Sequence, residues 1–236
     1  MDPRSAGELL SRSKKPPTRL ADADRSRAMA LYARALTNQD SELGTLLNSL
    51  RASKRDEDTM VIVTGDVAMN EVSPTPFSEG DVSDEATLTL PLVVRNPGSP
   101  SGVRIKSPTE SADIATTILT AFGLTLPRDF IGFDLANVAL EPSRYEGRVL
   151  VSEGEGKFSV RRGALVLVGA GDRDLRLCDL SLEPACVTDV RATYPLAYEG
   201  LRSNAFELLY NRQGVRAREP APIDSATASA LHLWGR

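Results

Sequence analysis

The sequence predicts an α/β fold: a partial sandwich with a mostly parallel sheet, followed by a small antiparallel sheet with one helix. Two observations favour the parallel part. The apolar run Met60–Val63 follows a long stretch with helical periodicity and lacks the alternation of a half-exposed strand. A second apolar run, Leu88–Arg95, precedes another helical pattern. From about residue 145, short strand-like segments separated by Gly-rich or charged turns are typical of an antiparallel meander.

The first predicted element is a helix from about Asp22 to about Ala52, after a flexible lead-in, 1–20, that is rich in Ser, Lys and Pro. Apolar residues recur along one face of this helix: Met29, Tyr32, Leu36, Leu43, Leu47 and Leu50. Gly44 lies inside it and costs about 1 kcal/mol relative to alanine. We therefore expect a neighbouring element to pack closely against Gly44.

The run Met60–Val63 is expected to be a strand that is buried on both faces and ends at Gly65-Asp66. Open α/β sheets bind ligands at the carboxyl ends of their strands. Asp66 is therefore the first candidate functional residue. The alternative is that Asp66 only caps a turn with Gly65.

A long acidic loop, 67–86, follows, and its residues Asp84 and Glu85 are expected to be solvated rather than catalytic. Leu88–Arg95 reads as the second strand, in which Pro91 marks a strand start or an irregular edge. We expect Arg95 to form a structural ion pair. The next predicted helix runs from Ser111 to Phe122 and ends at a glycine.

The second half contains four predicted strands and one helix. The strands are expected at 148–152, 157–161, 164–168 and 175–180, and the helix at 194–210. These elements divide the chain into a lead-in (1–20), an α/β part (22–140), a small antiparallel subdomain (145–212) and a tail (213–236). In the tail, His232 is expected to be a packed or exposed residue without a catalytic role.

Composition excludes several classes of function. A formal charge of −4 argues against a dedicated nucleic-acid binder, and no apolar run approaches the length of a membrane span. The single histidine, His232, excludes histidine-built zinc sites and catalytic triads from this chain alone, which leaves oxygen-liganded Ca²⁺ or Mg²⁺. Cys178 and Cys186 match no metal or redox spacing, so they are either buried free thiols or a disulfide.

Several segments, in one order along the chain, resemble the sulfatase family of the alkaline-phosphatase superfamily. The helix with Tyr32, Asp40 and Leu43-Gly44 precedes a strand that ends in Thr64-Gly65-Asp66, as in that family. Leu90–Gly98 resembles its Val-Pro-Leu-Ile-Val-Arg-x-Pro-Gly segment. The remaining matches are Ser111–Leu119, which is similar to an Asp-(hydrophobic)-x-Pro-Thr-Leu helix, and the closing strands 163–168 and 175–184.

The resemblance implies an alkaline-phosphatase-like sandwich of which this chain is the C-terminal half. It also implies that Asp66 is a calcium ligand in a hydrolase of sulfuric or phosphoric esters. The family's nucleophile, carried in a Cys/Ser-x-Pro-x-Arg motif, has no counterpart here, so no catalytic residue is assigned. Val67 stands where the family has His or Asn. The loop 70–87 lacks the family's substrate-contacting lysine and is acidic. The metal and substrate site is therefore expected to be degenerate.

Three functions stay open at this point. The chain is a sulfatase-like hydrolase that is inactive alone, a non-catalytic scaffold derived from a sulfatase, or a truncated gene product. Because half of the sandwich is not present, we expect self-association or a partner chain to cover the open sheet. No signal peptide is recognisable at Met1, so the expectation is a cytoplasmic protein unless the chain is part of a longer exported one.

Overall fold

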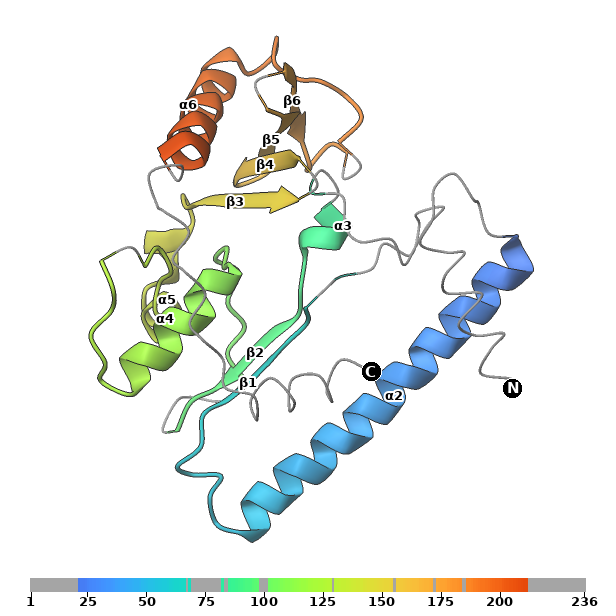
Figure 1. Cartoon of the computed structure of the whole chain (residues 1–236), viewed down its shortest axis with the longest axis vertical. Coiled ribbons are helices and arrows are strands. Elements are labelled where there is room, and N and C mark those ends of the chain that lie inside the picture. Colours follow the sequence, from blue (N-terminus) through green and yellow to red (C-terminus); the bar gives the residue numbers. More distant parts are fainter. Residues whose placement is uncertain are drawn as a thin grey trace, which may run out of the picture.

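The structure is a computed structural model. It describes residues 21–66, 68, 82, 85–97, 102–128, 130–154, 156–171, 173–183 and 186–211. A long helix lies beside a two-stranded sheet, and a four-stranded sheet with a covering helix lies at the other end of the molecule (Figure 1). The lead-in 1–20, most of the acidic loop and the tail with His232 lie outside the described residues. The α/β class and the small antiparallel sheet with a helix are confirmed.

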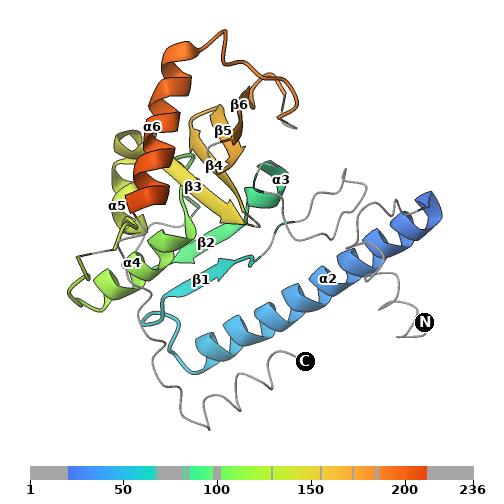
Figure 2. The ribbon, with the colours of Figure 1, turned by 45° about the horizontal axis from the view of Figure 1, so that its top comes forward.

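The first helix, α2, spans Asp22–Ala52, as predicted. Its predicted apolar face is only partly covered: Leu36 is exposed, and the other five residues of that face are partly buried. Ala28 is its one buried residue, whereas Leu36 and Leu46 are 45% and 57% exposed. A Cβ placed on Gly44 would meet nothing within 4 Å, so the expected close packing at this glycine is wrong for the described residues. Figure 2 shows α2 running along the same side of the molecule as the two-stranded sheet.

The two-stranded sheet consists of β1 (Val61–Thr64) and β2 (Leu92–Arg95), which pair antiparallel. The prediction of a mostly parallel sheet is therefore wrong for these two strands. The chain therefore reverses its direction between β1 and β2. The prediction that β1 is buried on both faces is also wrong, because its three apolar residues are only partly buried. Val93 and Val94, whose side chains point to opposite faces, are 62% and 36% exposed.

The segment before β2 differs from the prediction in one respect. A single helical turn, α3 (Glu85–Leu88), replaces the start of the predicted strand, and β2 begins directly after Pro91. Proline lacks the N–H that a strand interior would use, which is why the strand starts there. Arg95 donates a hydrogen bond to the backbone carbonyl of Asp56 (3.0 Å). Its role is structural, as expected, but its partner is this carbonyl rather than a carboxylate.

Helix α4 spans Ser111–Ala121 and is fixed at both ends by its own sequence. Glu110 and Asp113 form a capping box at its N-terminus, and Gly123, with a φ of 65°, follows its C-terminus. The sequence pattern missed a short helix, α5 (Leu135–Leu140), and a 3-10 turn, η1 (Pro142–Tyr145). Thr117 binds α5 to α4, because its hydroxyl accepts a hydrogen bond from the Leu135 N–H (2.9 Å).

A buried ion-pair network joins α4 to the second sheet. Arg148, at the start of that sheet, donates to Asp113 (Nη1 to Oδ2, 2.6 Å) and to Glu110. The side chain of Arg148 is 7% exposed and that of Asp113 is fully buried. Asp113 also accepts the backbone N–H of Phe133 (2.7 Å), and the Arg148 guanidinium lies 4.5 Å from the centre of the Phe133 ring. One carboxylate therefore fixes three segments of the chain relative to one another.

The second sheet is the predicted meander, with strands in the order β3-β4-β5-β6. Its strands are β3 (Val149–Gly154), β4 (Lys157–Arg162), β5 (Leu165–Ala170) and β6 (Arg173–Asp179), and α6 (Pro195–Asn211) follows. Alternate residues on one face pack against α6 and form the main core: Phe158, Val160, Leu167 and Leu177, with Leu201 and Ala205. Figure 1 shows α6 lying over this sheet.

The opposite face of the second sheet carries a smaller cluster that contains a disulfide. Cys178 and Cys186 are bonded, are 1% and 4% exposed, and pack against Val166 and Val168. Of the two alternatives that the sequence left open, the structure therefore has the disulfide. Disulfides of this kind form and persist in oxidising environments.

Replacement of Arg148 by methionine should strongly destabilise the fold. It would leave the buried Asp113 carboxylate without its charge partner, and breaking a buried ion pair costs about 3–5 kcal/mol. Urea unfolding would measure the loss. The control is Arg144→Met, because Arg144 pairs with Glu141 on the surface, where a change of under about 0.5 kcal/mol is expected. Equal effects of the two substitutions would show that the buried network contributes little.

Removal of the disulfide should lower the free energy of unfolding by about 2–3 kcal/mol, the value expected for closure of a loop this short. The variant combines Cys178→Ala with Cys186→Ala, and its thermal unfolding is compared with that of the oxidised wild-type protein. The reduced wild-type protein should lose about as much stability. If reduction left the unfolding midpoint unchanged, the bond would not constrain the fold.

Candidate functional site

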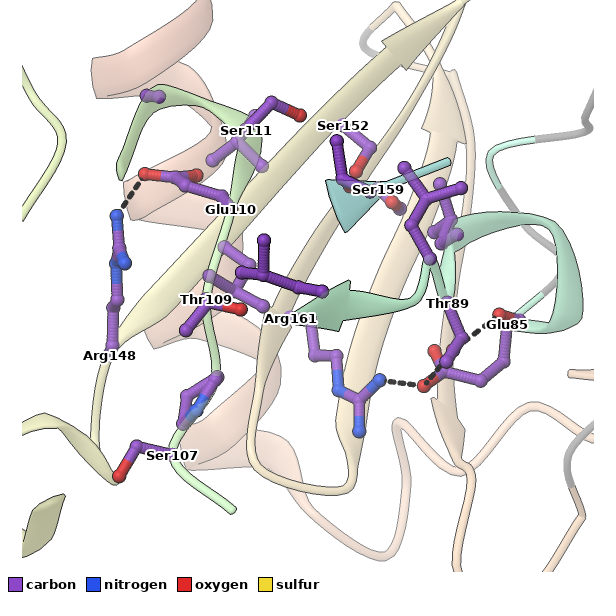
Figure 3. A pocket seen from close by; sticks show the side chains of 18 of the residues that line it. Glu85, Thr89, Ser107, Thr109, Glu110, Ser111, Arg148, Ser152, Ser159 and Arg161 are labelled. Atoms are coloured by element: carbon purple, nitrogen blue, oxygen red, sulfur yellow. Dashed lines mark hydrogen bonds and ion pairs between the residues drawn. The ribbon is translucent and has the colours of Figure 1, made fainter. Parts of the chain in front are cut away.

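A cavity of about 910 Å³ lies at the carboxyl end of β1. Thr64, Gly65 and Asp66 form one part of its wall. The other parts come from α3 and the residues after it, from the segment that leads into α4, and from one face of the β3–β5 sheet. Figure 3 shows side chains from these segments converging on it. The cavity is large enough for a ligand of drug or disaccharide size.

The sheet contributes a polar wall because of strand alternation. Ser152 of β3 pairs with Ser159 of β4, and Arg161 of β4 pairs with Val166 of β5. All four line the cavity, whereas the residues between them on β4 and β5 face the core under α6. Ser159 is only 2% exposed. One sheet therefore packs a hydrophobic core with one face and lines the cavity with both polar and apolar side chains on the other.

Two arginines in the cavity wall are held by carboxylates. Arg148 binds Glu110, as the dashed line in Figure 3 shows, and also Asp113. Arg161 binds Glu85 of α3, and its Nε donates to the carbonyl of Gly163 (2.7 Å). The Arg161 and Glu85 side chains are 34% and 27% exposed. The Glu85–Arg161 pair connects α3 with the second sheet across the cavity.

Lys106 also lines the cavity, on the segment between β2 and α4. The neighbouring Ser107 is buried, and its hydroxyl donates to the carbonyl of Pro142 (2.7 Å), which anchors this segment. Lys106 itself is exposed. Among the described residues, it has no ion pair or hydrogen bond.

Asp66, which the sequence predicted to follow the first strand, lies at the cavity wall and is exposed. No group of three or more His, Cys, Asp or Glu side chains among the described residues could hold a metal ion. These residues alone therefore do not fit the calcium site that the resemblance implies, since a calcium site takes six to eight oxygen ligands. The remaining acidic residues of the loop after β1 lie outside the described residues: Glu71, Glu79, Asp81 and Asp84.

The described cavity wall combines hydroxyl, carboxylate and guanidinium groups with apolar side chains. No cysteine or histidine of the described residues lines it. The hydroxyl of Ser181 lowers the pKa of Asp179 through a hydrogen bond, and that of Thr188 lowers the pKa of Glu183. Both carboxyl groups lie beyond the cavity, around the turn after β6.

The sequence predicted some of these residues and missed others. It placed Asp66 correctly at a strand end. Glu85, expected to be solvated, is partly buried in an ion pair of the cavity wall. Lys106, Arg148 and Arg161 were missed. Strand alternation marked Arg161 as sharing a face with Ser159, but it did not indicate which face would meet α3. Lys106 follows β2, so it is not the lysine that the resemblance implies before that strand.

The sulfatase family model matches residues 8–124. The inner membrane protein YejM of Salmonella typhimurium is 29% identical over 102 residues, which are 43% of this chain and 17% of YejM. Arylsulfatase K of Mus musculus is 24% identical over 182 residues, which are 70% of this chain and 33% of that enzyme. The chain therefore spans a third or less of the length of these curated relatives. The described part of the chain contains no helix with the length and apolarity needed to cross a membrane.

Solved structures with the same fold match most of the chain. BT4656 in complex with its substrate D-Glucosamine-2-N, 6-O-disulfate has a TM-score of 0.68 at 17% identity, over 93% of this chain and 47% of BT4656. The phosphonate monoester hydrolase of Agrobacterium radiobacter has a TM-score of 0.65 at 22% identity, over 84% of this chain and 44% of the hydrolase. At these identities the likeness establishes the fold.

Proposed function

Because the chain belongs to the sulfatase family, we propose that its cavity takes part in the hydrolysis of sulfuric or phosphoric esters and that the chain by itself does not catalyse this reaction. The observation that carries the proposal is the position of the cavity, at the carboxyl end of β1 with Asp66 in its wall. Ligands of open α/β sheets bind at such strand ends.

The relatives support this class of substrate. One matched structure holds an amino sugar disulfate, and another is a phosphonate monoester hydrolase. Both ligand classes are tetrahedral oxyanions joined to an organic group. The hydroxyls and amides of the cavity, with Ser111 at the N-terminus of α4, are suited to hydrogen-bond such esters.

Inactivity of the chain alone follows from the groups that hydrolysis requires. Ester hydrolysis needs an activated nucleophile and a proton donor for the leaving group. The sequence contains no Cys/Ser-x-Pro-x-Arg segment, both cysteines form the disulfide, and the single histidine lies in the tail. Turnover of an aryl sulfate or aryl phosphate by the purified chain, abolished by Asp66→Ala, would contradict this part of the proposal.

We infer that Asp66 supplies one carboxylate to a cation site whose other ligands lie outside the described residues. Millimolar Ca²⁺ should then raise the unfolding midpoint of the purified chain by about 2–5 °C over its value in EDTA. Asp66→Asn should abolish this rise, because an amide oxygen carries no charge to attract the cation. Differential scanning calorimetry measures the shift.

Asp58→Asn is the matched control, since Asp58 is an exposed aspartate just before β1, at the end opposite to Asp66. It should retain the full calcium response. If the unfolding curves of the wild-type chain were identical in EDTA and in Ca²⁺, Asp66 would not be a cation ligand. The chain would then have the sulfatase fold without a cation site.

A non-catalytic scaffold is the second candidate, and the open faces of the two-stranded sheet favour it. Val93 and Val94 are exposed on opposite faces of this sheet, which suits a surface that another layer covers. We expect the purified chain to associate with itself, with a mass by light scattering that rises with concentration.

Val93→Thr combined with Val94→Thr should shift this association towards the monomer. Threonine keeps the β-branched shape, so the strand is preserved while the surface becomes more polar. The control is Leu140→Thr, because Leu140 is 78% exposed but lies on α5, outside this sheet. A monomer at every concentration would contradict self-association.

A further inference from the structure

We propose that Lys106 is the residue that attracts the anionic group of a ligand into the cavity and that the Glu85–Arg161 ion pair limits this attraction. The proposal rests on the proposed function, since it concerns the same cavity, and it identifies the residues that set the charge of the ligand. It starts from the state of each cationic side chain in the cavity wall: Lys106, Arg148 and Arg161.

Arg148 is largely inaccessible to a ligand anion, because its side chain is 7% exposed and is paired with two carboxylates. Its two terminal nitrogens bind Asp113 and Glu110, and the face of its guanidinium lies against the Phe133 ring. A guanidinium in this state contributes to the fold, and its charge is balanced by two carboxylates.

Arg161 is compensated in a different way. Its Nη1 binds Glu85 and its Nε binds a backbone carbonyl, but about a third of its side chain is exposed. The pair is therefore a neutral element of the wall that retains guanidinium N–H groups near the cavity. Removal of the Glu85 charge would turn it into a cationic element without removing any donor.

Lys106 is the remaining cation. Its ammonium group has three donors, and among the described residues no carboxylate lies within ion-pair distance. Asp66 and Glu146 also line the cavity, are exposed and would repel an anion. Attraction of a sulfate or phosphate group by the described wall therefore depends on Lys106.

The backbone around Lys106 is well placed for this role. Ser107 anchors the segment to η1, and Thr109, Glu110 and Ser111 continue along the cavity wall into α4. The chain is thus anchored directly after Lys106, and Lys106 itself is exposed at the cavity. A flexible ammonium group on a fixed backbone can follow ligands of different shape.

The test is a titration with sodium sulfate at constant ionic strength, followed by two-dimensional amide NMR of the full chain. Constant ionic strength is required because salt screens exposed charges. We expect sulfate to shift the amides of residues 106, 107, 109–111 and 64–66. Lys106→Met should weaken the apparent affinity about fivefold, the effect of one exposed charge pair. Glu85→Gln should strengthen it by up to about fivefold.

Arg104→Met is the matched control. Arg104 is exposed, lies two residues before Lys106 and does not line the cavity, so its removal changes the net charge equally. It should leave the affinity for sulfate unchanged. The amide spectra of all three variants also report whether the fold is intact.

Three results would overturn the inference, and they differ in what else they affect. If sulfate shifts the cavity amides with equal affinity in the wild type and in Lys106→Met, the role of Lys106 is wrong while the cavity still binds the anion. If tens of millimolar sulfate shifts no cavity amide in the wild type, both the role of Lys106 and the proposed use of the cavity for anionic esters are wrong. If Arg104→Met weakened the affinity for sulfate as much as Lys106→Met, the effect of Lys106 would come only from the net charge of the protein, and its specific role would be wrong.

Discussion

The Asp113 carboxylate is the constraint on which the arrangement of the described structure depends. It lies in the first turn of α4 with no exposed surface, and it accepts hydrogen bonds from the backbone of Glu110 and Phe133 and from the Arg148 guanidinium. A charge in this position is stable only with its partners present. The start of β3 is thereby fixed against α4, and the distance between the two walls of the cavity is set.

Strand alternation places the hydrophobic core on one face of the second sheet and the cavity wall on the other. Its face under α6 holds the fully buried residues Val160, Leu167 and Leu177, which give the subdomain its core. Its opposite face holds the disulfide cluster at one end and the polar cavity wall with Ser159 and Arg161 at the other. Substitutions on the cavity face can therefore change the ligand preference while the core stays intact.

The first sheet is in the opposite situation, because it has apolar residues on both faces and the described residues cover them only in part. The β-branched residues of β1 and β2 are typical of a strand pair inside a larger sandwich. The sulfatase-fold proteins that match this chain are about twice its length. The cavity at the end of β1 is consequently open to groups supplied by another layer, which is where the proposed hydrolysis needs a nucleophile.

Local patterns in the sequence determined a large part of this structure. Helical periodicity defined α2, α4 and α6, alternation and turn residues defined the four strands of the meander, and Gly65-Asp66 marked the end of β1. The family motifs also depend on short segments. Each of these features is determined by neighbours within a few residues, so the sequence alone predicts them.

Only the tertiary structure decided the direction of pairing and the partners of the charges. A buried strand has the same apolar pattern in parallel and antiparallel sheets, so β1 and β2 gave no sign of their antiparallel pairing. Arg148 meets Asp113 across 35 positions and Arg161 meets Glu85 across 76. Such contacts depend on the path of the whole chain. The charge left in the cavity, at Lys106, becomes apparent only once these pairs are known.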